Sequence, residues 1–153
     1  MRNSRPILLV EDDDVDAMTT QRALNELKVT NELIHTVDGE DALKYLRDEG
    51  NREPCVILLD LNMPRMNGFE FLKIAKADTT LRKIPVIVLT TSDDDEGVVE
   101  SFDLGVAGYI VKPVSYSQFV EAMRAVDMYW TLSRLPNGVE QTPSLSGAYR
   151  SAT

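Results

Sequence analysis

Asp60-Leu61-Asn62-Met63-Pro64-Arg65-Met66-Asn67-Gly68 follows directly on the apolar run Cys55-Val56-Ile57-Leu58-Leu59. A short apolar run of this kind indicates a buried strand. In α/β sheets the functional side chains stand at the carboxyl ends of the strands, and Asp60 occupies such an end. Pro64 and Gly68 mark the turn into the following helix. Asp60 is therefore the first candidate for a functional residue.

Three other strand ends carry polar side chains of complementary kinds. Glu11-Asp12-Asp13 closes the first apolar run, Thr90-Thr91 closes the fourth, and Lys112-Pro113 closes the fifth. Three carboxylates that lie close together repel one another unless a cation or a proton compensates. The pattern therefore predicts either a divalent-cation site with a carboxylate nucleophile or a cluster in which one acid keeps its proton.

The residue types suit phosphoryl transfer. Asp60 can attack a phosphorus centre as a carboxylate, which gives an acyl phosphate. The Lys112 ammonium and the Thr90 hydroxyl can contact the oxygens of the transferring group. Mg²⁺ prefers oxygen ligands in an octahedron and keeps some of its waters, which suits Glu11 and Asp12. Asn62 can complete the metal shell through its backbone carbonyl. Mg²⁺ is thus the expected cofactor.

Strand-like and helical patterns alternate along the chain. The strand-like runs are Ile7–Val10, Leu33–Val37, Val56–Leu59, Val86–Leu89 and Tyr109–Val111. Apolar residues at helical spacing lie between and after them: Ala17, Thr20, Leu24 and Leu27; Ala42, Leu43 and Leu46; Phe71, Leu72 and Ala75; Val98, Val99 and Phe102; and Phe119, Ala122, Met123, Val126 and Trp130. Such alternation indicates a parallel sheet with right-handed crossovers and helices on both faces. The prediction is an α/β, flavodoxin-like (βα)5 doubly wound sheet of strand order 2-1-3-4-5.

Composition limits the possible partners and compartments. The formal net charge of -9 disfavours binding to nucleic acid or to anionic lipid. The first apolar run is too short for a signal peptide or a membrane span, so we expect a cytoplasmic protein. Cys55, the single cysteine, is expected in the core or at its boundary. His35, the single histidine, lies in the second strand and is expected to be structural.

Over roughly residues 5 to 130, the chain resembles the response-regulator receiver domains of two-component signalling. The resemblance rests on Leu9-Val10-Glu11-Asp12, the 60–68 segment, Val88-Leu89-Thr90 and Gly108-Tyr109-Ile110-Val111-Lys112-Pro113. It implies that Asp60 accepts a phosphoryl group from a phosphohistidine of a partner histidine kinase. It also implies Mg²⁺ ligation by Glu11, Asp12, Asp60 and the Asn62 carbonyl. Such a protein signals through conformational change and protein contacts, and it catalyses only its own phosphorylation and dephosphorylation.

The resemblance assigns further roles. It implies phosphoryl contacts from Thr90 and Lys112, and a conformational switch at Thr90 and Tyr109. In the family the bond that corresponds to Lys112-Pro113 is usually cis. Glu11 stands where many receivers have Asp. Within the family, the chain looks most like stand-alone receivers paired with phytochrome-type kinases, which makes a bacteriophytochrome the expected partner.

The end of the chain differs in composition. Pro136-Asn137-Gly138 interrupts any helix, and the remainder is rich in Ser, Thr, Gly and Pro. We expect a receiver domain over residues 1–135 and a flexible tail over 136–153, too short for an output domain. The last helix, expected over Ser115 to Arg134, carries Met128, Tyr129 and Leu132 away from its core stripe. A homodimer would bury them; the alternative is that the tail folds back over them.

Other interpretations of single residues remain open. Glu11 to Asp14 could be a solvated turn that caps the first helix, a role that we assign to Asp13 or Asp14. The run from Asp93 to Glu96 is expected to start a helix and not to bind a second metal. Thr91 is an alternative hydroxyl to Thr90, Lys112 could be a surface cation, and Tyr109 could be plain core.

Three rival functions fit the sequence less well than the receiver does. A haloacid-dehalogenase-type phosphatase also uses an aspartyl nucleophile, but it needs a second acid two residues on, where this chain has Asn62. A flavodoxin-like carrier would need hydroxyls and amides after the first strand, where this chain has acids. A pseudo-receiver that acts only by binding proteins would suit a damaged site, and this site is intact.

Overall fold

The computed structural model describes residues 4–61, 67–90, 103–111 and 115–132. Within these ranges the side chains of Thr90, Tyr109, Val111 and residues 129–132 are outside the description. Several residues and segments singled out in the sequence also lie outside the description. They are Asn62, Thr91, Lys112, Pro113, the run from Asp93 to Glu96, the helix expected around Val98 to Phe102, Arg134 and the 136–153 tail.

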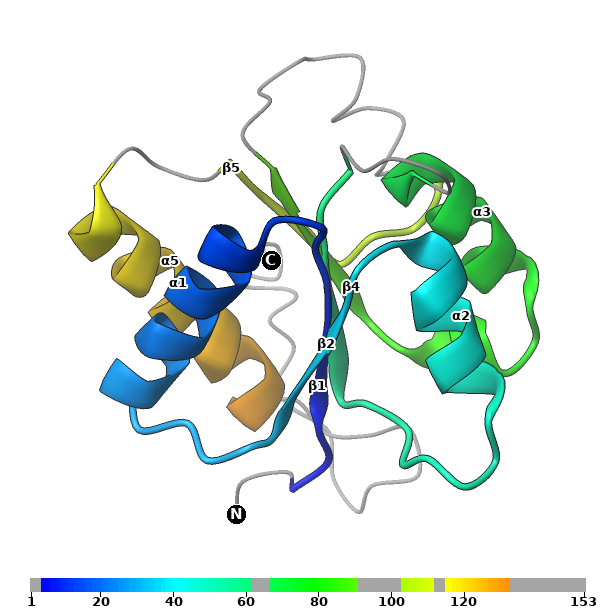
Figure 1. Ribbon diagram of the computed structural model, residues 1–153, viewed down its shortest axis with the longest axis horizontal. Coiled ribbons are helices and arrows are strands. Elements are labelled where there is room, and N and C mark those ends of the chain that lie inside the picture. The colour runs from blue at the N-terminus through cyan, green and yellow to red at the C-terminus, as the bar shows by residue number, and fades with distance from the viewer. Residues whose placement is uncertain (1–3, 62–66, 91–102, 112–114, 133–153) are drawn as a thin grey trace.

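Five parallel strands form one sheet at the centre of the molecule (Figure 1). They are β1 (Ile7–Val10), β2 (Leu33–Thr36), β3 (Val56–Leu59), β4 (Val86–Thr90) and β5 (Gly108–Val111). Their order is β2-β1-β3-β4-β5, which confirms the predicted doubly wound topology. β2 ends one residue earlier than predicted because the Val37 backbone N–H donates to the Asp41 carboxylate, in the first turn of the next helix, at 3.1 Å.

The register brings the carboxyl ends of the central strands together. β1 pairs with β2 on one side and with β3 on the other, with Val10 opposite both Thr36 and Leu59. β4 continues the sheet beside β3, and β5 lies beside β4. The residues that follow Val10 and Leu59 therefore leave the sheet at the same edge, next to each other.

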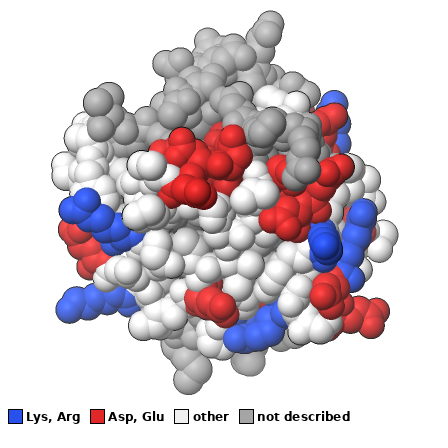
Figure 2. Space-filling view, viewed as in Figure 1, with Lys and Arg blue, Asp and Glu red and all other residues white. Residues whose placement is uncertain are grey.

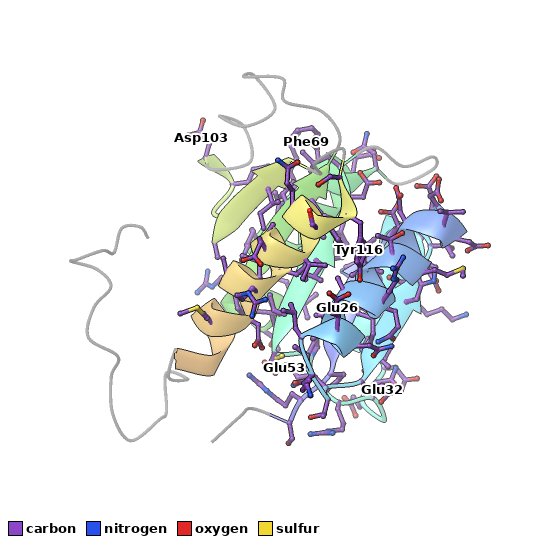
Figure 3. The ribbon with its side chains drawn as sticks, turned by 90° about the vertical axis from the view of Figure 1, so that its left-hand side faces the viewer. Glu26, Glu32, Glu53, Phe69, Asp103 and Tyr116 are labelled. Atoms are coloured by element: carbon purple, nitrogen blue, oxygen red, sulfur yellow. The ribbon has the colours of Figure 1, made fainter. Side chains whose placement is uncertain are left out.

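Helices cover both faces of the sheet. Helices α1 (Asp14–Glu26) and α5 (Tyr116–Leu132) lie on one face, and α2 (Gly39–Arg47) and α3 (Gly68–Ala77) lie on the other (Figure 1). A short 3₁₀ helix, η1 (Leu81–Lys83), packs beside α3. Across the α1–α5 contact the Tyr116 hydroxyl donates to Glu26 Oε1 at 3.0 Å, and the Arg22 guanidinium lies 4.1 Å from the centre of the Tyr116 ring (Figure 3).

Alternate strand residues fill two cores, one on each side of the sheet. Ile7 and Leu9 of β1 join the cluster under α1 and α5, whereas Leu8 and Val10 join the cluster under α2 and α3. All four are at most 2% exposed, which explains why the strand reads as a continuous apolar run. Burying each such side chain stabilises the fold by about 1.5–3 kcal/mol.

The predicted helix faces are the ones that pack. The apolar residues predicted for α1, α2, α3 and α5 are buried at most positions. Leu27, Leu46 and Ala122 are half-buried, and the side chain of Trp130 lies outside the description. Cys55 is buried in the core, as expected. None of the described helices has both the length and the apolar composition that a membrane crossing requires.

Polar caps start three of the helices at the edge where the strands end. Asp13 caps α1: its carboxylate accepts from the backbone N–H groups of Val15 and Asp16 at 2.8 and 3.1 Å. Asp38 caps α2, and Asn67 forms a capping box with Glu70 at the start of α3. Asp13, and not Asp14, is thus the capping residue of the first turn, and this role is separate from Glu11 and Asp12.

Candidate functional site

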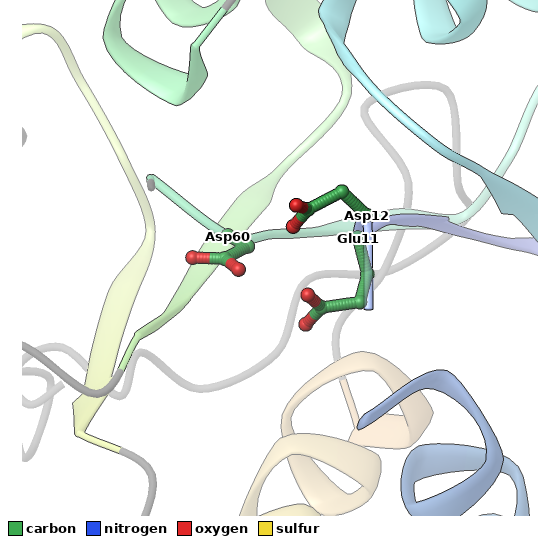
Figure 4. Close-up of side chains that lie close together, drawn as sticks. All are labelled: Glu11, Asp12 and Asp60. Atoms are coloured by element: carbon green, nitrogen blue, oxygen red, sulfur yellow. The ribbon is translucent and has the colours of Figure 1, made fainter. Parts of the chain in front are cut away.

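Three acidic side chains converge at the carboxyl edge of the sheet. Glu11 and Asp12 follow β1, and Asp60 follows β3. One carboxylate oxygen from each lies within 4.8 Å of the others, and the three side chains face a common space (Figure 4). The three carboxylates therefore lie as close together as the sequence predicted.

Backbone hydrogen bonds that extend the sheet by one residue set this arrangement. The Asp60 N–H donates to the Val10 carbonyl at 3.0 Å, and the Glu11 N–H donates to the Thr36 carbonyl at 2.9 Å. These bonds continue the β3–β1 and β1–β2 ladders past the ends of the strands. Glu11 and Asp60 are consequently fixed by the register of the sheet itself and not by a separate loop conformation.

The environments of the three acids differ. Glu11 is 2% exposed and Asp60 is 8% exposed, whereas Asp12 is exposed to solvent. Glu11 Oε2 accepts a hydrogen bond from the Asp13 backbone N–H at 3.3 Å. Two like unit charges about 4 Å apart repel by about 4 kcal/mol at an effective dielectric constant near 20. Holding three acids in this space thus favours a bound cation.

The surroundings strengthen the attraction for cations. Asp13, the cap of α1, and Asp14, in its first turn, are exposed beside Asp12. Glu40 and Asp41 lie in the first turn of α2. Figure 2 shows acidic side chains gathered on the upper part of this face. A concentration of one sign of charge raises the local concentration of the opposite ion. The donor set consists of oxygen atoms, which fits a hard divalent cation.

Gly68 brings the start of α3 against the backbone that carries Asp60. Its N–H donates to the Leu61 carbonyl at 3.1 Å. A Cβ on this residue would lie 2.5 Å from Leu61 Cα and 2.6 Å from the Asp60 carbonyl oxygen. The sequence predicted Gly68 as a turn marker; the structure adds that a side chain here would press on the residue that follows β3.

The remaining predicted site residues are placed by backbone alone or lie outside the description. Thr90 ends β4 opposite Val111, and Tyr109 lies in β5 opposite Val88, so both belong to strands on the β3 side of the sheet. Their side chains, together with Asn62 and Lys112, are among the undescribed groups. Their roles therefore stay predictions.

One contact at the site was not anticipated. His35 Nε2 lies 2.7 Å from the carbonyl oxygen of Glu11. His35 occupies β2, beside the end of β1, and its side chain is exposed. The register of β2 against β1 is the signal that could have found it, because that register sets His35 opposite Leu9, two residues before Glu11.

Comparison with known proteins identifies the family. The profile of the response regulator receiver domain matches residues 7–124, which is more than half of the chain. This chain belongs to the response regulator receiver domain family. The members of this family act in signalling, and they pair with histidine kinases.

Individual relatives match over most of their length. The response regulator Rcp1 of Synechocystis is 36% identical over 81% of this chain and 87% of its own, and its Mn²⁺-bound crystal structure superposes with a TM-score of 0.79. The probable methanogenesis regulatory protein FilR2 of Methanothrix harundinacea is 39% identical over 81% of this chain and 82% of its own. The structure of phosphorylated RcpA, a cyanobacterial phytochrome response regulator, is 38% identical, with a TM-score of 0.81 over 88% of this chain and all of RcpA.

Proposed function

We propose that this chain is a stand-alone response regulator in which Asp60 accepts a phosphoryl group from the phosphohistidine of a sensor histidine kinase. The observation that carries the proposal is the approach of Glu11, Asp12 and Asp60 to within 4.8 Å at the edge of the sheet. The family of the chain supports it. The phosphorylated state of RcpA supports it for a relative of similar fold.

The acids take different parts in the reaction. An Asp60 oxygen forms the new bond to phosphorus as the bond from phosphorus to the histidine nitrogen of the donor breaks. Glu11, Asp12, Asp60 and the Asn62 carbonyl would hold Mg²⁺, which supplies positive charge next to the phosphoryl oxygens. The Mn²⁺-bound form of Rcp1 supports a divalent cation in such a site. Thr90 and Lys112 contact the phosphoryl oxygens, and Thr90 with Tyr109 forms the switch.

The reactions of this site are limited to formation of the acyl phosphate and its hydrolysis. Asn62, two residues after the nucleophile, has no proton to exchange as a general acid or base, so a phosphatase that turns over small esters is disfavoured. The protein then signals through a conformational change that is read by other proteins. With a charge of -9, its direct readers are proteins and not nucleic acid.

The partner and setting are inferred from the relatives. RcpA is a phytochrome response regulator, which favours a bacteriophytochrome-type kinase as the phosphodonor.

We assign the reaction to the cytoplasm, the receiver domain to residues 1–135 and a flexible tail to residues 136–153. A homodimer through α5 is part of the proposal, because Met128 is 55% exposed on that helix.

The test is phosphorylation by a small donor. We expect acetyl phosphate with Mg²⁺ to add one phosphoryl group, measured by the mass of the intact protein, and EDTA to prevent the addition. Asp60→Asn should abolish it, because an amide is not a nucleophile of this kind. Glu53→Gln, which alters an exposed acid that pairs with Arg5 at 3.3 Å, is the control and should be labelled normally. Labelling of Asp60→Asn equal to that of the wild type would falsify the assignment.

A further inference from the structure

Three consecutive peptide groups carry the acids at the end of β1, and each is held differently. The Val10–Glu11 peptide bonds to both neighbouring strands, through Asp60 N–H and the Thr36 carbonyl. The Asp12–Asp13 peptide donates its N–H to Glu11 Oε2. The Glu11–Asp12 peptide lies between them, past the last ladder bond. Its carbonyl contacts the imidazole of His35 at 2.7 Å.

The His35 contact is a hydrogen bond of defined direction. A carbonyl oxygen only accepts, so His35 Nε2 carries the hydrogen and donates it. The distance of 2.7 Å is at the short end of the range for nitrogen donors. Thr36, the next residue of β2, donates its hydroxyl to the Leu9 carbonyl at 2.9 Å. Two neighbouring side chains of β2 thus bond to backbone carbonyls at the end of β1, one within the strand and one just past it.

We propose that His35 is a positioning residue that holds the Glu11–Asp12 peptide so that both carboxylates face Asp60, and thereby raises the affinity of the site for divalent cations. This inference rests on the proposed function of the acid cluster. His35 itself is no ligand in this scheme. It acts through the backbone that joins two of the ligands.

The planarity of the peptide explains why one bond can position two acids. The Glu11 carbonyl and the Asp12 nitrogen belong to one rigid plane, so a rotation about either bond that joins this plane to a Cα atom turns the Cα–Cβ bonds of Glu11 and Asp12 relative to each other. Like charges within 4.8 Å favour such a rotation when no cation is bound. A donor on the carbonyl opposes it. Because His35 is exposed, its loss leaves no cavity in the core.

The test compares two replacements of similar size. His35→Gln keeps an N–H donor at a reach similar to that of Nε2, whereas His35→Leu removes the donor. We expect His35→Leu to weaken Mg²⁺ binding about fivefold, equivalent to about 1 kcal/mol, as measured by titration calorimetry. His35→Gln should restore most of the affinity. Glu32→Gln, at the opposite end of β2, should bind as the wild type does.

A second readout needs no metal. In the metal-free protein, amide exchange of Asp13, whose N–H donates to Glu11 Oε2, should be about fivefold faster in His35→Leu than in wild type or His35→Gln when followed by NMR. Unchanged exchange and unchanged affinity in His35→Leu would overturn the proposal, as would equal losses in both variants. If the exchange pattern holds while wild type fails to bind Mg²⁺, the positioning role stands and the proposed function of the cluster fails.

Discussion

At the scale of single residues, Gly68 shows how closely the site depends on packing. Gly68→Ala would bring a methyl group within 2.6 Å of the Asp60 carbonyl and within 2.5 Å of Leu61 Cα, and neither backbone atom can move aside like a flexible side chain. We expect the free energy of unfolding to fall by about 1–3 kcal/mol, as for other overpacked sites. We also expect slower phosphorylation by acetyl phosphate, because Asp60 is displaced. Urea unfolding and intact-protein mass measure the two effects.

Gly50 supplies the matched control for this prediction. A Cβ on Gly50 would meet only the Asp48 Oδ1 atom, at 3.3 Å, and that side chain lies on the surface. Gly50→Ala should therefore change neither stability nor phosphorylation by much. If the two glycine variants have the same stability and the same rate of phosphorylation, the close approach of Gly68 to the strand end does not matter for either property.

Cys55 gives a prediction about pH. Burial raises the pKa of its thiol to about 11, from an ordinary value of 9.0, with the Arg5 charge acting in the opposite direction. Between these values the folded protein keeps the thiol proton while the unfolded chain loses it, so ionisation favours the unfolded chain. The free energy of unfolding should thus fall as pH rises from about 9 to about 11.

The contribution of Cys55 is separable from that of other groups. Urea unfolding at a series of pH values should show a shallower decline for Cys55→Ala than for the wild type, because lysines and tyrosines titrate in both. Equal declines in the two proteins would refute the assignment to the thiol. Below about pH 9, the difference in stability between the two should be constant.

The acids of the site could be predicted from sequence because residue type and strand end are both local signals. Glu11, Asp12 and Asp60 each follow an apolar run, and in the structure these two runs are the neighbouring strands β1 and β3. The His35 bond could not be predicted in this way, since it depends on the register of β2 against β1. The steric demand at Gly68 likewise depends on how closely the segment after β3 returns, which no local pattern encodes.

At the scale of elements, α5 packs on α1 through both buried and exposed contacts, and the two kinds should differ in their effect on stability. Phe119 is 5% exposed and belongs to the core cluster that includes Ala23 and Leu24 of α1. We expect Phe119→Ala to lower the free energy of unfolding by about 3–5 kcal/mol, because it removes apolar contacts and leaves a cavity. Phe119→Leu, which keeps most of the volume, should cost less than about 1.5 kcal/mol.

The exposed contact between the same two helices should matter little for stability. Tyr116→Phe removes the hydroxyl that donates to Glu26 (Figure 3). It keeps the ring that lies beneath the Arg22 guanidinium. Water replaces a hydrogen bond at an exposed position at small cost. Urea unfolding of the three variants gives the comparison. A Tyr116→Phe loss as large as that of Phe119→Ala would mean that surface pairing, and not the core, holds α5 in place.

Elements were predicted well where periodicity was strong. The bounds of β1 and β3 agree with the prediction, and each of the other three strands differs by one residue where a cap or the ladder decides the end. β2 shows the reason: hydrogen bonding by the Asp41 carboxylate takes the Val37 amide out of the sheet. Side chains that compete for backbone groups in this way are not visible in a pattern of apolar residues.

At the scale of the whole molecule, the exposed part of α5 leads to a prediction about assembly. Met128 is 55% exposed near the end of a helix that runs from Tyr116 to Leu132. An isologous contact would bury it in both copies. We expect light scattering to give the mass of a dimer for the 153-residue chain and also for a chain that ends at Pro136.

The alternative occupant of this surface is the tail. In that case the longer chain is a monomer and the chain ending at Pro136 associates. Met128→Glu, which places a charge on the contact, should dissociate the dimer, whereas Arg124→Glu at the neighbouring exposed position of α5 tests whether charge alone is sufficient. Monomers for both chains, with and without a phosphoryl mimic, would refute the dimer.

The pairing of β1 with both β2 and β3 also constrains how the native state can be reached. The three acids come from two strands that meet only when the chain between Val10 and Val56 closes into a loop. Every folding route must pay that closure entropy before the acids can meet, whereas β4 and β5 are free to join the sheet earlier or later. The unfolded chain therefore has no preformed cluster, and a cation that binds there acts as a ligand of the native state alone. Its concentration then enters directly into the balance between folded and unfolded protein.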